Sequence, residues 1–307
     1  MLETVLRLIT EIVGMPGVLV EELMSRHTTF KIGGPADVII EPPGEKQLAA
    51  VMKMLKRFKV PYFVMGNGSN LLVGDKGIRG AVVKISGNMS KCGVDEDDDT
   101  IIRAESGVKL SKLANTALNN ALSGFEFAAG IPGTLGGAVY MNAGAYGGEM
   151  KDVIKEVTFI DTSDCSIHTI PVEECDFGYR KSRFSSGDAI ITGAAVKLEN
   201  RDMTEIREKM NDLAERRRSK QPLDRPSAGS TFKRPEGYFA GTLIQDTGLK
   251  GYRIGGAEVS EKHAGFIVNA GGATAKDVRE LIEYVKAEVE KKYGVELEPE
   301  VKFVGEF

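Results

Sequence analysis

The sequence predicts an α+β protein built from two domains. Stretches with helical spacing of apolar residues alternate with short strand-like runs over the first two thirds of the chain. The 307 residues also exceed the usual size of one domain. After Glu199 the pattern changes to a long helix with a basic end. We therefore expect one domain over residues 1–199, made of two α+β lobes split near residue 85. A smaller α+β domain follows over 200–307, and its last strand could return to the first lobe.

The expected elements follow from the spacing of apolar residues. Apolar side chains recur every three or four positions in the expected helices, at 2–13, 48–58, 108–122, 203–218 and 274–293. Short apolar or alternating runs predict strands at 38–41, 62–65, 81–85, 101–104, 153–161, 189–198 and 297–306. Gly14 ends the first helix and Gly294 the last. The first helix is amphipathic and carries charges within its apolar pattern, which is unlike a signal peptide.

Composition excludes several classes of protein. The net charge is −4 and the sequence pI is about 5.7, whereas a general nucleic-acid binder is usually basic. The three cysteines, Cys92, Cys165 and Cys175, are odd in number and form no C-x-x-C, so we expect a reducing cytoplasm. The three histidines lack metal-ligand spacing, so we expect no metal site. No apolar run has membrane-spanning length, so we expect no membrane insertion. The sequence makes no prediction of the oligomeric state.

A first glycine-rich loop follows the strand expected at 62–65. It reads Gly66-Asn67-Gly68-Ser69-Asn70-Leu71. Glycine permits positive φ and close approach of a ligand, and serine and asparagine add hydrogen-bond donors. The loop lacks the Gly-Lys-Ser/Thr ending of a Walker loop, and Leu71 fills the third glycine position of a Rossmann fingerprint. Taken alone, it fits a phosphate-binding loop and a plain tight turn equally well.

A second loop, at 129–148, is unusual because it is long and contains no charged residue. It reads AGIPGTLGGAVYMNAGAYGG. Solvent-exposed loops are normally polar, and a glycine-rich segment loses much conformational entropy on folding unless a ligand or tight packing compensates. A chain pressed against a large flat ligand, or a helix start facing a phosphate, accounts for this composition. We favour that interpretation over a glycine-rich segment that only packs between elements.

The two loops together resemble a known family. Their pairing is similar to that of the UDP-N-acetylenolpyruvoylglucosamine reductases, also called UDP-N-acetylmuramate dehydrogenases. Four other segments resemble motifs of this family in the same order: TTFKIGGPA at 28–36, FGYRKSRF at 177–184, AGSTFKRP at 228–235 and LEPEV at 297–301. Ordered motifs over nearly the whole chain are far more specific than any single one.

The resemblance implies a fold, a cofactor and a reaction. It implies an FAD-binding domain of the vanillyl-alcohol oxidase type over 1–199 and a substrate-binding domain over 200–307. NADPH would reduce UDP-N-acetylglucosamine enolpyruvate to UDP-N-acetylmuramate through bound FAD, in peptidoglycan precursor synthesis. Neither loop contains cysteine or histidine, so we expect the FAD to be noncovalent.

The resemblance also implies residues for each ligand. Those that would hold FAD are Gly66, Asn67, Gly68, Ser69, Asn70, Leu71, Gly130, Ile131, Pro132, Gly133, Thr134, Gly136, Gly137, Ala138, Asn142, Ala143 and Gly144. Those that would contact the substrate are Tyr146, Tyr179, Lys220 and Arg234. The chain has no room for the inserted subdomain of the longer family type, so Tyr146 would cover the substrate. We expect Lys220 to meet the diphosphate, and Arg216 to Arg218 to be mostly a solvated helix end.

Three residues would carry the chemistry. The hydride adds to the enolpyruvyl C3, so the site must stabilise the charge that develops on the substrate carboxylate. Arg180 suits that task because its planar guanidinium binds a carboxylate through two donors. Glu300 would share a proton at the same carboxylate, which requires a raised pKa. Ser230 would protonate C2.

Two alternatives remain open. The chain could be an FAD-dependent oxidase or dehydrogenase of the same superfamily that acts on a sugar or hydroxy acid. It could also be a nucleotide-binding module without catalysis. NADPH turnover that depends on the enolpyruvyl sugar nucleotide distinguishes the reductase from both.

Overall fold

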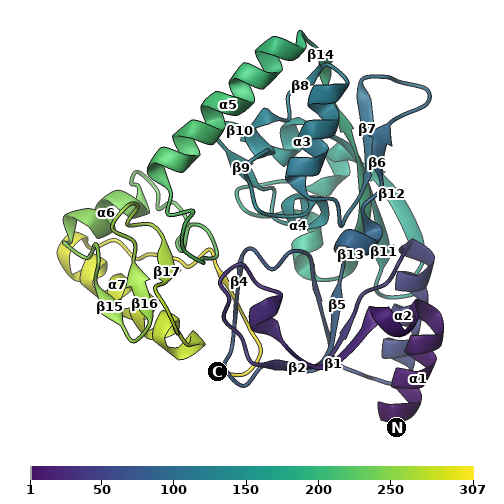
Figure 1. Cartoon of the computed structure of the whole chain (residues 1–307), viewed down its shortest axis with the longest axis horizontal. Helices are drawn as coiled ribbons and strands as arrows, with labels where there is room; N and C mark the ends of the chain where they lie inside the picture. The colour runs from purple at the N-terminus through teal and green to yellow at the C-terminus, as the bar shows by residue number, and fades with distance from the viewer. Residues whose placement is uncertain (1) are drawn as a thin grey trace. The chain divides into compact units, whose positions relative to one another are not determined.

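Residues 2–307 are described by a computed structural model, with side chains from Val5 onward. The chain divides into two units, each made of several segments. Unit 1 comprises Met1–Leu19, Ile39–Asn67 and Ala81–Arg217, and unit 2 comprises Val20–Val38, Gly68–Gly80 and Arg218–Phe307. Figure 1 shows the elements along the chain.

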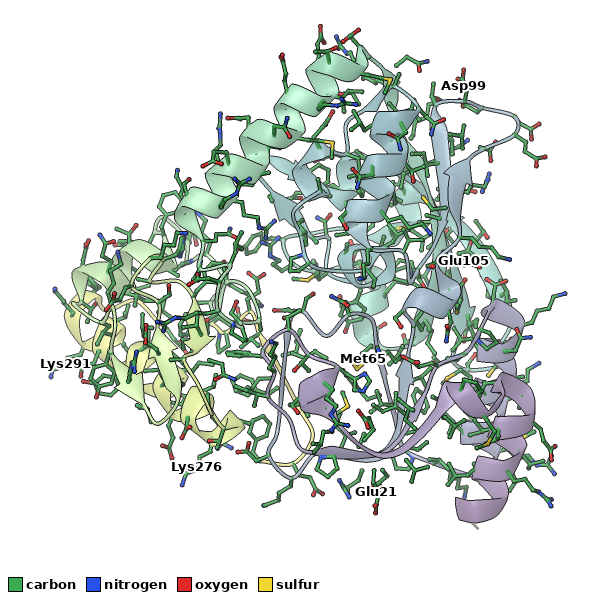
Figure 2. The ribbon with its side chains drawn as sticks, in the orientation of Figure 1. Glu21, Met65, Asp99, Glu105, Lys276 and Lys291 are labelled. Carbon is green, nitrogen blue, oxygen red and sulfur yellow. The ribbon has the colours of Figure 1, made fainter. Side chains whose placement is uncertain are left out.

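A four-stranded sheet is formed by the first part of the chain. The elements of this part of the chain are α1 (Leu2–Val13), β1 (Val18–Leu23), β2 (Pro35–Ile40), α2 (Glu45–Arg57), β3 (Tyr62–Met65), β4 (Leu71–Val73) and β5 (Ile78–Lys84), and β4 lies outside this sheet. The strand order is β1-β2-β5-β3. Strands β3 and β5 are parallel, with Tyr62 opposite Ala81 and Met65 opposite Lys84. Met65, labelled in Figure 2, ends β3, so the first glycine loop leaves the sheet directly.

A five-stranded antiparallel sheet is the centre of unit 1. Its order is β12 (Ile167–Pro171), β11 (Ile154–Asp161), β13 (Ala189–Lys197), β7 (Ile101–Glu105) and β6 (Cys92–Val94). Helices α3 (Leu110–Asn119) and α4 (Leu135–Tyr140) pack against it, α4 mainly on β13 (Figure 1). Val157 and Val196 are fully buried in the core between these layers. The acidic turn joining β6 to β7 is exposed at Asp99 (Figure 2).

Short elements complete unit 1. They are β8 (Leu122–Ser123) paired with β14 (Glu199–Asn200), and β9 (Gly144–Ala145) paired with β10 (Gly148–Glu149). Helix α5 (Met203–Lys220) follows; Ile206 is its buried side chain, and most of its other side chains are exposed. The second glycine loop therefore contains one short helix, α4, and a tight hairpin of β9 and β10. The sequence indicated a segment against a flat ligand or a helix start facing a phosphate, and it did not indicate the hairpin.

Unit 2 has its own core around a long helix. Its elements are α6 (Ala240–Asp246), β15 (Arg253–Ile254), β16 (Ala257–Val259), β17 (Ile267–Asn269), α7 (Ala275–Tyr293) and β18 (Lys302–Val304). Helix α7 packs on β15 and β16, and Lys276 and Lys291 mark its two ends (Figure 2). Thr274 caps the helix in a capping box with Asp277, and Gly294 ends it with φ 66°.

The strand expected at 297–306 is shorter than predicted. Only Lys302–Val304 forms β18, which pairs in parallel with β4. Pro299 has no N–H to donate, and it forms an isolated bridge with Phe232. Among residues 2–307, no helix is long and apolar enough to cross a membrane.

Candidate functional site

The two glycine-rich loops meet within unit 1. The Asn67 side chain donates a hydrogen bond from Nδ2 to the carbonyl oxygen of Pro132 at 2.7 Å. A Cβ at Gly66 would collide with Oγ1 of Thr134, so only glycine permits this approach. Segments more than sixty positions apart, each predicted to hold the same ligand, are therefore in direct contact.

One side of the second loop is held by backbone hydrogen bonds to the segment before α3. Its backbone N–H groups at Leu135 and Gly136 donate to the carbonyl oxygens of Val108 and Ser106, both at 2.8 Å. A Cβ at Gly136 would lie 2.7 Å from Cβ of Ser106, whereas the nearest atom to one at Gly137 is 3.6 Å away. Gly137 is also exposed. One side of this segment is thus packed against the protein, and the backbone at Gly137 remains open to a ligand.

Asn142 connects the second loop to the segment before Arg180. It is 1% exposed and has a left-handed backbone with φ 45°. Its Nδ2 donates to Oε2 of Glu149 at 2.9 Å and to the Gly178 carbonyl oxygen at 3.0 Å, while Oδ1 accepts from the Lys151 N–H at 3.0 Å. Because the chain itself occupies both ends of this amide, Asn142 acts as a structural clamp.

Arg180 lies on a tight, strained turn. Its φ is 55°, and its guanidinium lies 5.3 Å from the ring centroid of Tyr179. A hydrogen bond from Lys151 and the nearby positive charge of Arg180 help to hold the pKa of Glu149 below its ordinary value, although partial burial opposes this. Bulky residues rarely adopt left-handed backbone, and such strain concentrates at functional sites. Tyr146, at φ 53°, shares this feature with Arg180.

Ser230 and Glu300 lie on neighbouring segments of unit 2. The Glu300 N–H donates to the carbonyl oxygen of Thr231 at 2.8 Å, one residue from the exposed Ser230. Thr231 is buried, and its Oγ1 accepts a hydrogen bond from the Ile267 N–H at 3.0 Å. Asn70 completes the cluster, because its Nδ2 donates to the Glu300 carbonyl oxygen at 3.1 Å. The end of the first glycine loop and the two predicted catalytic segments therefore meet.

The remaining predicted residues fall into both units. Arg180 belongs to unit 1, whereas Ser230 and Glu300 belong to unit 2. Lys220 is exposed at the end of α5. Arg234 lies with its guanidinium carbon 4.0 Å from the ring centroid of Phe239, which is 60% exposed. The guanidinium is thus held over an exposed aromatic ring.

The three arginines at the end of α5 differ from one another. We expected all three to be mostly solvated, and Arg216 and Arg218 are indeed exposed. Arg216 also pairs with Asp212 at 2.9 Å. Arg217 is partly buried, which the run of identical side chains did not indicate.

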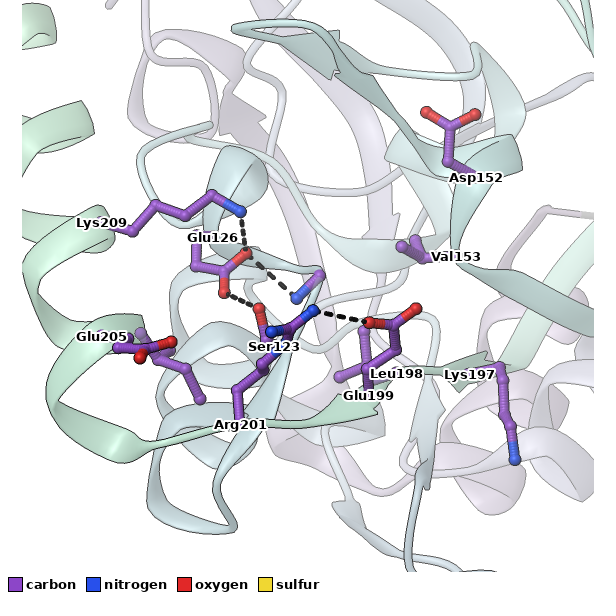
Figure 3. A pocket seen from close by; sticks show the side chains of 12 residues that line it. Ser123, Glu126, Asp152, Val153, Lys197, Leu198, Glu199, Arg201, Glu205 and Lys209 are labelled. Atoms are coloured by element: carbon purple, nitrogen blue, oxygen red, sulfur yellow. Dashed lines mark hydrogen bonds and ion pairs between the residues drawn. The ribbon is translucent and has the colours of Figure 1, made fainter.

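A cavity of about 430 Å³ lies elsewhere in unit 1, between β8, β14 and the start of α5 (Figure 3). Glu126 is 3% exposed there and accepts hydrogen bonds from Ser123 Oγ at 2.7 Å and Lys209 Nζ at 3.1 Å. Burial opposes its ionisation, but these donors outweigh it and lower the pKa of Glu126. None of the predicted site residues lines this cavity.

Comparisons with known proteins cover nearly the whole chain. Residues 36–170 match the FAD binding domain family, and residues 221–304 match the family described as UDP-N-acetylenolpyruvoylglucosamine reductase, C-terminal domain. A UDP-N-acetylenolpyruvoylglucosamine reductase from Caldanaerobacter subterraneus subsp. tengcongensis is 54% identical over 285 residues, 93% of each protein.

Solved structures agree with these matches. The crystal structure of UDP-N-acetylenolpyruvylglucosamine reductase from Thermus caldophilus is similar with a TM-score of 0.79 and 38% identity, over 93% of this chain and 99% of that one. Alkyldihydroxyacetonephosphate synthase is similar with a TM-score of 0.50 and 15% identity, over 64% of this chain and 40% of that one. This second likeness concerns the fold alone.

Proposed function

Because the chain belongs to the UDP-N-acetylenolpyruvoylglucosamine reductase family, we propose that Arg180, Ser230 and Glu300 carry its catalytic chemistry. The chain is an FAD-dependent oxidoreductase that uses NADPH to reduce enolpyruvyl-UDP-N-acetylglucosamine in peptidoglycan synthesis. The expected reductase function, FAD cofactor and vanillyl-alcohol oxidase type of FAD-binding domain are thereby confirmed.

The contact between the two glycine loops supports the proposed flavin site. The hydrogen bond from Asn67 to Pro132 and the packing of Gly66 on Thr134 join two glycine-rich segments of backbone. The open side of Gly137 leaves that backbone accessible. FAD, when bound, supplies the hydride-transfer chemistry, and the role of these loops is to hold it without covalent attachment.

The hydrogen bond between Glu300 and Thr231 is the observation that supports the catalytic assignment. It fixes a carboxylate-bearing segment beside the segment that carries Ser230. A serine hydroxyl held there can deliver a proton to the substrate C2, while Glu300 shares a proton at the substrate carboxylate. Arg180, held on its turn by the Asn142 clamp, binds and polarises that carboxylate.

Substrate contacts and domain roles complete the proposal. Residues 1–199 hold the flavin and 200–307 bind the sugar nucleotide, which the two matched regions, 36–170 and 221–304, support. Tyr146, Tyr179, Lys220 and Arg234 contact the substrate. The exposure of the two tyrosines, 44% and 52%, leaves them available for that role. The NADPH requirement and the three free cysteines fit action in the cytoplasm.

The deciding experiment follows NADPH oxidation by the purified protein. Oxidation should depend on added enolpyruvyl-UDP-N-acetylglucosamine, and the product should be UDP-N-acetylmuramate. Denaturation should release intact FAD into the supernatant. Oxygen-dependent oxidation of a simple sugar, without need for the enolpyruvyl substrate, would instead identify an oxidase.

A further inference from the structure

Arg217 presents two buried donors that no acceptor satisfies. Within the described part of the chain, Nε and Nη1 of Arg217 are inaccessible to solvent and have no hydrogen-bond partner. Buried polar side-chain atoms are nearly always hydrogen-bonded, because an unpaired buried donor costs free energy. The neighbouring Arg216 pairs with Asp212 instead. At this helix end, Arg217 is the residue with buried donors left unpaired, and Oε1 of Gln221 is a buried acceptor without a partner.

The same guanidinium lies against the second glycine loop. A Cβ at Gly130 would come within 2.8 Å of Nη1 and 3.0 Å of Cδ of Arg217. Glycine at 130 is what allows the guanidinium to reach the loop backbone. Gly130 lies inside the region that matches the FAD binding domain, whereas Arg217 lies between the two matched regions. Neither match thus assigns Arg217 a role.

Among the residues whose side chains the structure describes, no carboxylate compensates the charge of Arg217. Burial lowers the pKa of Arg217, and the opposing influence comes from the Tyr146 phenol. Arginine nevertheless stays protonated in proteins, so the buried charge destabilises the unliganded protein until an anion reaches it. An anionic oxygen on a ligand in this loop would satisfy the charge and the two donors together.

We propose that Arg217 donates hydrogen bonds to an anionic oxygen of the FAD bound at the second glycine loop. The proposal rests on the flavin site proposed above. Among the ligands of the reaction, FAD is favoured because the contact is with Gly130, in the loop and matched region assigned to the flavin. The same oxygen chemistry occurs in the diphosphate of the sugar nucleotide, which the experiment must separate.

The test compares Arg217→Gln with the matched control Arg216→Gln, one position away on the same helix. FAD dissociation from the full-length holoprotein is followed by the rise of flavin fluorescence on dilution. UDP binding to the same holoproteins is followed by calorimetry. For Arg217→Gln the Kd for FAD should rise about ten- to a hundredfold, since a hydrogen bond to a charged group is lost. The Kd for UDP should not change, and Arg216→Gln should match the wild type for both ligands.

Thermal unfolding gives a second readout that a structural role would not produce. After removal of FAD, Arg217→Gln should unfold at or above the wild-type Tm, because an uncompensated buried charge has been removed. The increase in Tm on adding FAD should be smaller than for the wild type. Arg217→Lys, which keeps the charge, should retain FAD better than Arg217→Gln.

The contrary outcomes are distinct. An unchanged Kd for FAD in Arg217→Gln would overturn the proposal, whether or not UDP binding changes. An equal loss in Arg216→Gln, or a lowered Tm without FAD, would assign Arg217 a structural role and would also overturn it. In each of these cases the wild-type holoprotein still binds FAD, so the proposed function stands. A wild-type protein that cannot bind FAD would refute the proposed function itself.

Discussion

The backbone N–H of Glu300 donates a hydrogen bond to the carbonyl oxygen of Thr231 at 2.8 Å. Thr231 is buried and directly follows the exposed Ser230. This bond keeps the Ser230 and Glu300 segments in one relative position within unit 2. Substitutions at the two side chains should therefore affect the same half of the reaction, the half in which the substrate is reduced.

Ser230→Ala should separate the two half-reactions. Flavin reduction by NADPH needs no proton at the substrate C2, so stopped-flow bleaching should proceed near the wild-type rate. Reoxidation by the enolpyruvyl substrate should slow by about a hundred- to ten-thousandfold, because a positioned acid is lost. Equal slowing of both phases would show that Ser230 is structural. If neither phase slows, the proton comes from Glu300 or a water molecule.

Gly137→Val should abolish flavin binding while the fold is retained. A Cβ added at this position would make an ordinary contact, 3.6 Å from Oγ1 of Thr134, but the side chain would stand between the backbone and the ligand. Gly136→Ala is the contrasting variant, because its Cβ would press on Ser106 at 2.7 Å and should lower Tm. Flavin absorbance and far-ultraviolet circular dichroism are measured on both proteins. Full flavin occupancy in Gly137→Val would show that this loop is not part of the FAD site.

Asn142→Ala should weaken substrate binding more than flavin binding. The substitution removes the hydrogen bonds to Gly178, Glu149 and Lys151, and so releases the turn that carries Arg180. We expect a destabilisation of about 1–3 kcal/mol, since buried partners lose their hydrogen bonds. The KM for the enolpyruvyl substrate should rise while bleaching by NADPH stays normal. If the variant loses FAD while the KM for the enolpyruvyl substrate is unchanged, Asn142 contacts the flavin, as the sequence predicted.

The free energy of unfolding should decrease as the pH falls below the pKa of an ordinary histidine side chain. Burial, with help from Lys250, lowers the pKa of His263, whose Nδ1 accepts a hydrogen bond from the Gly265 N–H at 3.1 Å. Below pH about 6.5 His263 is protonated in the unfolded chain but not in the folded protein. The stabilisation present above that pH is therefore lost as the pH falls toward and through the pKa of His263 in the folded protein.

Urea denaturation at pH 8 and pH 5.5 measures this contribution. His263→Gln should reduce the difference between the two free energies of unfolding. His168, which is exposed, provides the control, and His168→Gln should keep the wild-type difference. A full wild-type difference in His263→Gln would place the pH dependence on other groups.

The sequence predicted best the elements whose pattern and caps agree. The helix expected at 274–293 is observed at Ala275–Tyr293, with Thr274 as its cap. The strand at 62–65 is observed with the same bounds. Both glycine loops were recognised because glycine and missing charge are visible without any knowledge of the fold.

Elements that depend on distant partners were missed. Strand β16 carries Glu258, which is 4% exposed and receives a hydrogen bond from Arg225. A charged residue in a three-residue strand breaks the alternation on which strand prediction rests. The sequence likewise did not indicate that Arg217 is more buried than its neighbours. The residue that Arg217 packs against, Gly130, is far away in the sequence.

The pairing of β18 with β4 has a consequence for the order in which the protein assembles during synthesis. Leu71 to Val73 leave the ribosome early, but their partners Lys302 to Val304 are made last among the paired strands. Every segment of unit 1 has been translated by Arg217, so unit 1 can fold while unit 2 still lacks its long helix. Leu72 is fully buried in the finished protein, in a core that contains Phe30 and Ile32 but is otherwise made of residues from Ala228 onward. The nascent chain must therefore hold Leu72 without most of its core partners for much of translation.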